Sequence, residues 1–113
     1  MEVRMAWLLR QGDVLASIEL APSRARGATR LIGRKSLDGG LLIESRRAIH
    51  TFGVRFPIDV AYLDRSRVVI GVARLRPYRV GLLPRHARAV LEAEAGAFER
   101  WRLVVGDELE IKE

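Results

Sequence analysis

The sequence contains no cysteine. Without cysteine the chain cannot form disulfide bonds, thiolate metal sites or a cysteine nucleophile, and this composition fits a reducing compartment. Lysine is nearly absent as well. Of the 20 basic residues, two are lysines, Lys35 and Lys112, and the rest are arginines. No apolar run is long enough to span a membrane, and the five apolar residues before Arg10 are too few for a signal peptide. We therefore expect a cytoplasmic protein with no membrane span.

The composition is that of an ordinary globular domain. Hydrophobic residues make up 49% and charged residues 30% of the 113 residues. This length fits one domain with one core. No internal repeat or linker divides the chain, so we expect a single β-rich domain over residues 1–113.

The net charge of +6 is unevenly distributed along the chain. Residues 65–91 contain seven arginines and no acidic residue, whereas residues 92–113 contain seven acidic and three basic residues. A basic surface favours an anionic ligand, an acidic protein partner or nucleic acid. The few aromatic residues are not interleaved with the arginines as a base-stacking surface requires, so we do not expect nucleic acid as the partner.

Apolar runs of strand length alternate with turn residues along most of the chain. We expect strands at residues 3–10, 14–20, 41–43, 58–63, 68–73, 87–95 and 108–112. The runs at 3–10 and 14–20, joined by the Gly-containing turn at 11–13, should form a first hairpin. The runs at 58–63 and 68–73 are rich in β-branched residues and should form a second hairpin at the centre of the sheet. Short helices are expected at 23–32, where the segment is basic and follows a proline, and at 97–103. This pattern predicts a mainly β fold, a β-sandwich or barrel with one or two short helices.

Residues 50–64, with the sequence HTFGVRFPIDVAYLD, resemble the signature of domain of unknown function family 192, a group of small uncharacterised prokaryotic proteins. Three further segments, residues 33–37, 90–96 and 105–107, resemble other parts of the family pattern and follow in the same order. The resemblance covers residues 14–112 and implies a jelly-roll-like β-sandwich. The family supplies no catalytic residues to transfer, so the resemblance implies a fold and leaves the function open.

Two carboxyl groups interrupt strands that are otherwise apolar. Asp59 has apolar neighbours on both faces of its strand, and Glu92 interrupts a later strand in the same way. A buried carboxylate needs a cation or several donors, and Arg55, His50 and Arg74 are the candidate partners of Asp59. Each acid is either a structural residue or part of a site, and two carboxyl groups facing one cavity could share a proton.

His50 and Thr51 stand at the start of a segment that is broken by Gly53 and Pro57. Near neutral pH a histidine in such a place can transfer a proton or donate to an anion, although it can equally be a hydrogen-bonded scaffold residue. We expect no metal site, because no closely spaced pair of ligands is present. No sequence feature calls for a cofactor.

A binding module is favoured over an enzyme. In this first hypothesis His50, Thr51, Arg55, Asp59 and Glu92 line a pocket for a small polar or anionic ligand. One alternative is an enzyme that uses His50 and Asp59 as an acid–base pair. The other is a structural or protein-interaction domain whose basic surface, within residues 65–88, binds an acidic partner.

Overall fold

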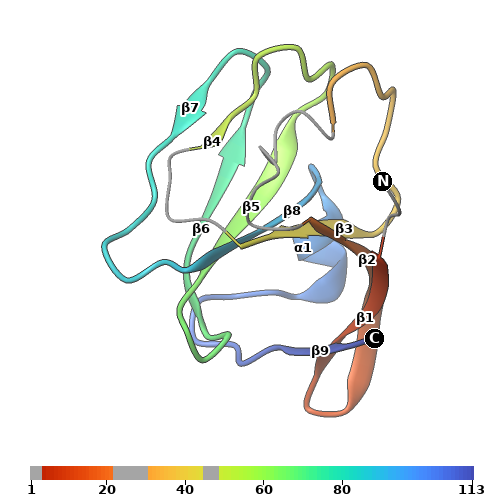
Figure 1. Cartoon of the computed structure of the whole chain (residues 1–113), viewed down its shortest axis with the longest axis vertical. Helices are drawn as coiled ribbons and strands as arrows, with labels where there is room; N and C mark the ends of the chain where they lie inside the picture. Colours follow the sequence, from red (N-terminus) through yellow and green to blue (C-terminus); the bar gives the residue numbers. More distant parts are fainter. Residues whose placement is uncertain (1–3, 22–30, 45–48) are drawn as a thin grey trace.

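A seven-stranded sheet forms the body of the protein (Figure 1). The structure, a computed structural model, describes residues 4–21, 31–44 and 49–113. The strands of this sheet are β1 (Arg4–Arg10), β2 (Asp13–Ala21), β3 (Gly40–Ile43), β5 (Ile58–Leu63), β6 (Val69–Leu75), β8 (Ala89–Glu94) and β9 (Glu110–Lys112). Their order in space is β6-β5-β8-β3-β2-β1-β9. The β2–β3 pair is parallel and the other neighbouring pairs are antiparallel.

The residues in the turns explain where the two predicted hairpins form. Gln11 and Gly12 join β1 to β2, and both have positive φ angles, 51° and 84°, as a tight two-residue hairpin turn requires. The turn from β5 to β6 is closed by Asp64, whose Oδ1 accepts hydrogen bonds from the N–H groups of Ser66 at 2.8 Å and Val68 at 3.0 Å. Both hairpins are therefore confirmed, and each turn is specified by its own residues.

Each face of the sheet has its own apolar core. On the inner face the sheet curves around the short helix α1 (Ala97–Trp101), as Figure 1 shows. The inner core combines residues from both ends of the sheet with the helix: Leu8, Ile18, Ala61, Leu63, Val69, Leu91 and Phe98. The outer face is covered by the segments 31–37 and 51–57, which contribute Leu31, Leu37, Val54 and Phe56 to an outer core. A strand covered on both faces is apolar throughout, and β5 is buried at all six positions.

The sheet curls toward closure without becoming a barrel. At one end Val69 donates from its backbone N–H to the carbonyl of Asp107 at 2.8 Å, and Gly106 donates to the carbonyl of Val69 at the same distance. An isolated bridge joins Val68 to Glu108. These bonds connect the start of β6 to the chain just before β9, so the two edges of the sheet meet at this end only.

A second, two-stranded sheet consists of β4 (Ile49–His50) and β7 (Val80–Gly81). Sequence reasoning missed it, because each strand has two residues and lies between glycines and prolines. It is an antiparallel pair in which His50 lies opposite Val80.

Two predictions about the main sheet need correction. The β5–β6 hairpin is not at the centre, because β6 is an edge strand and β8 and β3 occupy the inner positions. The partly exposed residues of β6 agree with its edge position, which β-branched composition alone does not reveal. The predicted helix at 97–103 exists but ends at Trp101, because Arg102 adopts a left-handed conformation with φ 53°. Most of the helix expected at 23–32 lies outside the described residues.

Gly39 and Gly33 form a matched pair for testing how closely the loop before β3 packs. A Cβ on Gly39, which has φ 68°, would lie 1.9 Å from the carbonyl oxygen of Ser17, whereas a Cβ on Gly33, with φ 84°, would meet no atom within 4 Å. We expect Gly33→Ala to cost about 1 kcal/mol of unfolding free energy, from its φ angle alone, and Gly39→Ala about 3 kcal/mol or more. Urea denaturation measures both, and equal losses would contradict the close contact.

Candidate functional site

Three of the five candidate residues are buried. Thr51, Asp59 and Glu92 are exposed by 0, 4 and 1%, and they are the buried polar residues of the part of the chain that the structure describes. Sequence reasoning found them because each polar group interrupts an apolar or irregular segment. They do not form one site, because strand register and loop position separate them.

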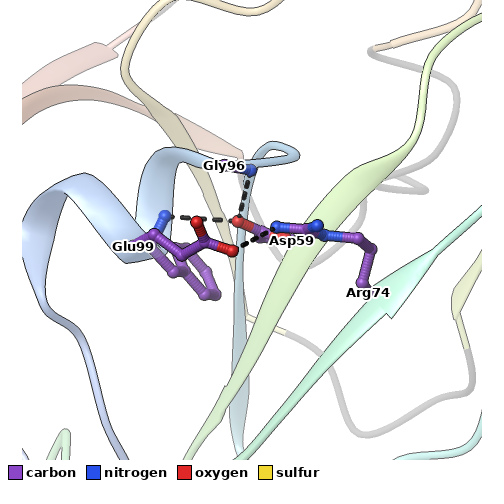
Figure 2. Close-up of polar contacts among 5 residues, drawn as sticks. Asp59, Arg74, Gly96 and Glu99 are labelled. Carbon is purple, nitrogen blue, oxygen red and sulfur yellow. Dashed lines mark hydrogen bonds and ion pairs between the residues drawn. The ribbon is translucent and has the colours of Figure 1, made fainter.

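The carboxylate of Asp59 is fully engaged by groups of the protein (Figure 2). Its Oδ1 accepts a hydrogen bond from Nε of Arg74 at 2.9 Å. Arg74 lies directly opposite Asp59 on β6, which confirms one of the predicted partners. Its Oδ2 accepts hydrogen bonds from the backbone N–H groups of Gly96 at 2.9 Å and Phe98 at 3.2 Å. Three donors of the protein thus hold the Asp59 carboxylate between β6 and the start of α1.

Asp59 and Arg10 hold the two ends of α1 against the sheet. The N-cap of the helix is Gly96, which has no side chain to bind the free N–H groups, and Asp59 from β5 takes that role. At the other end the guanidinium of Arg10 donates to the carbonyl of Trp101 at 2.8 Å and to Asp107 Oδ2 at 2.9 Å. Both ends of the helix thus depend on charged side chains from strands distant in sequence.

Thr51 fastens the loop that covers the outer face. Its hydroxyl donates to the carbonyl of Arg76 at 2.6 Å and accepts from the N–H of Arg79 at 2.8 Å. The backbone N–H of Thr51 also donates to the carbonyl of Arg79 at 2.8 Å. His50 precedes it in β4, and Arg55 follows it as an exposed residue of the same loop. The predicted segment therefore belongs to the outer face, whereas Asp59 points to the inner face.

Glu92 is buried in the outer core. It lies opposite Val60 on β5 and Leu41 on β3, and its Oε1 has no hydrogen-bond partner among the described residues. Burial raises its pKa to about 7. The pKa of Tyr62 is raised too, first by burial and then by the charge of Glu92. Because Asp59 lies opposite Ala93, one position along β8, the two acids point to opposite faces and share no cavity.

A cleft of about 500 Å³ opens on the inner face beside Asp59. Its apolar walls are Val72 on β6, Phe98 on α1, and Leu103 and Val104 after the helix. Its charged lining residues are Asp59, Arg74, Glu99 and Arg102. Arg74 bridges Asp59 and Glu99, with Nη2 donating to Glu99 Oε1 at 3.3 Å. Arg102 has no acidic partner within residues 4–21, 31–44 and 49–113.

Sequence reasoning found Asp59 and Arg74 but missed the rest of this cleft. The cleft forms where an edge strand meets the end of a five-residue helix, and no local pattern marks such a meeting. Within the described segments, no three His, Asp or Glu side chains group closely enough to bind a metal. In the same described segments, no helix is long and apolar enough to cross a membrane.

Residues 6–111 match the family model of DUF192, described as Uncharacterized ACR, COG1430. The chain belongs to the DUF192 family. Among similar proteins, a UPF0127 protein of Pyrococcus abyssi is 36% identical over 62 residues, 55% of this chain and 53% of that protein. A UPF0127 protein of Thermococcus sibiricus is 33% identical over 63 residues, 56% of this chain and 41% of that protein. The match thus spans about half the length of these relatives or less.

Two solved structures share the fold across nearly the whole chain. A protein of unknown function from Novosphingobium aromaticivorans superposes with a TM-score of 0.76 at 21% identity, covering 96% of this chain and 84% of that one. A putative transcription regulator from Sinorhizobium meliloti superposes with a TM-score of 0.77 at 20% identity, covering 97% and 94%. At this identity the likeness shows the DUF192 fold, and the function must be argued from the residues.

Asp59→Asn should weaken the attachment of α1. The amide of asparagine has no charge to pair with Arg74. It also has one acceptor oxygen in place of two, so it cannot accept hydrogen bonds from both the guanidinium and the two backbone N–H groups as the carboxylate does. We expect a loss of about 2 to 3 kcal/mol in unfolding free energy, measured by urea denaturation. Glu99→Gln removes the exposed arm of the same network and should change stability little. Equal stability of Asp59→Asn and the wild type would show that the Asp59 carboxylate does not stabilise the attachment of α1.

Glu92→Gln should stabilise the protein at neutral and higher pH. The folded pKa lies near 7 and the unfolded value near 4.5, so the folded state binds the extra proton between these values. Stability from this group is therefore greatest below pH 4.5, falls as pH rises, and levels off above 7. The advantage of the Gln variant should grow by about 3 kcal/mol between pH 5 and 8, measured by denaturation at each pH.

The matched control for Glu92→Gln is Glu110→Gln, because Glu110 is exposed on β9. Its stability difference from the wild type should stay nearly constant over the same pH range. A Glu92→Gln difference that is equally flat would show that burial does not raise the pKa of Glu92.

Proposed function

We propose that this protein is a non-enzymatic binding module for a small organic anion, and that the ligand occupies the cleft beside Asp59. The observation that carries the proposal is the combination of a cleft of about 500 Å³, apolar walls and an arginine without an acidic partner in the described chain. Ligand sites commonly have this size, apolar walls and a few polar groups that orient the ligand.

The charges around the cleft favour a carboxylate or a similar anionic group at one end of the ligand. Asp59 is neutralised by Arg74 and two N–H groups, and Glu99 shares the same arginine. This leaves Arg102 as the free charge, and a planar guanidinium can bind a carboxylate with two parallel hydrogen bonds. The apolar body of the ligand would lie against Val72 and Phe98.

The expected ligand is still a small anion, as the sequence suggested, but most of the residues that would bind it are different. Asp59 lies at the cleft and organises its walls, whereas Thr51 and Glu92 are buried on the other face. Arg55 is exposed on the outer loop, so Arg102, and not Arg55, would bind the anionic group of the ligand. The acid–base alternative has less support, because both oxygens of Asp59 already accept hydrogen bonds from Arg74 and from backbone N–H groups.

Benzoate and benzyl alcohol make a matched probe pair, since they share an aromatic body and differ in charge. Titrating each into labelled protein, we expect amide shift changes at Phe98, Leu103 and Val104. Arg102→Asn should weaken benzoate binding about tenfold and leave benzyl alcohol unaffected, because a hydrogen bond to a charged group contributes about 1.5 kcal/mol. Asparagine tolerates the positive φ at this position.

Arg65→Asn is the control for net charge, because Arg65 is an exposed residue of the distant β5–β6 turn. It should bind benzoate like the wild type. If both aromatic probes leave the amides around the cleft unshifted, or if Arg65→Asn weakens benzoate as much as Arg102→Asn does, the proposal fails.

A further inference from the structure

An exposed apolar stripe runs along β7 and the residues on either side of it. Tyr78, Val80 and Leu82 are exposed by 66, 54 and 78%, while Gly81 between the last two is buried. Alternate residues of an extended segment point to one side, so Val80 and Leu82, which flank the buried Gly81, share a surface, and Tyr78 lies in the turn just before them. The ring of Phe52 lies 6.3 Å from that of Tyr78 and extends the stripe onto the neighbouring loop. Large apolar side chains grouped in this way on a surface mark an interaction site.

The protein holds this stripe in place at a cost. Tyr78 has a left-handed backbone conformation, φ 62°, which is unfavourable for a residue with a side chain. The buried Thr51 stabilises the turn, because its hydroxyl and backbone bind the chain at Arg76 and Arg79 and its carbonyl accepts from the N–H of Tyr78 at 3.2 Å. The hidden Thr51 therefore fixes the exposed Tyr78 in one position.

Arginines accompany the stripe on both segments that carry it. Arg55 lies on the Phe52 loop, and Arg76, Arg79 and Arg85 lie on the β7 segment; all four are exposed. None of them has an acidic partner within the described residues. The acidic residues in β9 and at the C-terminus are remote, because β9 and the C-terminus lie on the opposite side of the molecule from β7 (Figure 1). This surface is therefore strongly basic as well as apolar.

We propose that the stripe and its arginines form a docking surface for the anionic face of a lipid bilayer. Tyr78, Val80 and Leu82 insert at the level of the headgroups, and the arginines around them bind lipid phosphates. Apolar contact combined with cationic contact is the pairing that holds peripheral proteins on anionic membranes. Docking of this kind needs no segment that spans the bilayer.

The aliphatic residues of the stripe favour a bilayer over nucleic acid as its partner. A single strand of nucleic acid uses arginines and aromatic rings, which stack on its bases, but it offers nothing that would bury Val80 and Leu82. A bilayer interface buries aliphatic and aromatic side chains alike. The most exposed residue of the stripe, Leu82, is aliphatic, so it is the residue that separates the two partners.

The test is co-sedimentation of the full chain with large vesicles at about 0.1 M NaCl. Vesicles of equimolar phosphatidylcholine and phosphatidylglycerol should bind the protein, and vesicles of phosphatidylcholine alone should bind it at least tenfold more weakly. Leu82→Ser should weaken binding about tenfold. Alanine at Arg76 and Arg79 should weaken it about fivefold per arginine.

Two variants control for general changes in charge and apolar surface. Val14→Ser alters another exposed apolar residue at the start of β2, and Arg65→Ala removes an exposed arginine far from the stripe. Both should bind anionic vesicles like the wild type, and thermal unfolding should show every variant folded. The proposal is overturned if anionic vesicles do not bind, or if Leu82→Ser binds as the wild type does. Binding of oligothymidylate in preference to vesicles would assign the surface to nucleic acid instead.

Discussion

The carboxylate of Asp59 is the interaction on which the inner half of the structure depends. A helix of five residues is far too short to be stable by itself, so α1 exists because the sheet holds it. Asp59 binds its first N–H groups and Arg10 binds its last carbonyls. Helix α1 in turn places Phe98 over the inner core and forms one wall of the cleft. A single buried anion thus connects the strand pairing of β5 to the cleft proposed to bind a ligand.

Asp59 and Glu92 show how one position in register changes the chemistry of a buried acid. Both interrupt apolar strands, and their strands are neighbours. Asp59 points to the inner face, where a helix terminus and an arginine on the exposed edge strand supply donors. Glu92 points to the outer core, where its Oε1 has no hydrogen-bond partner among the described residues, and burial raises its pKa. The first acid organises the fold and the second is a cost that the fold carries.

Local pattern was enough to predict both hairpins and the strand that carries Glu92, and it named Arg74 as one of three candidate partners of Asp59. These features depend on strand composition, turn residues and the two-residue period of a strand. The edge position of β6 and the β4–β7 pair depend on contacts between segments far apart in sequence, which composition does not encode. The cleft needs three such segments to meet, and the exposed stripe needs the turn at Tyr78 to be fastened by Thr51. The sequence therefore indicated the buried polar residues and the basic segment 65–88, but it gave no sign of the cleft or of the apolar stripe.

The two proposed surfaces belong to opposite faces of the sheet, which makes them compatible in one molecule. The cleft lies on the inner face, beside α1, while the β7 segment is fastened to the loop that covers the outer face. A bilayer in contact with Tyr78 and Leu82 would leave the cleft open to solvent. The acidic residues near the C-terminus would then point away from the anionic lipid, and their repulsion would favour this orientation over the reverse one. The uneven charge seen along the chain is thus the property that would orient the molecule.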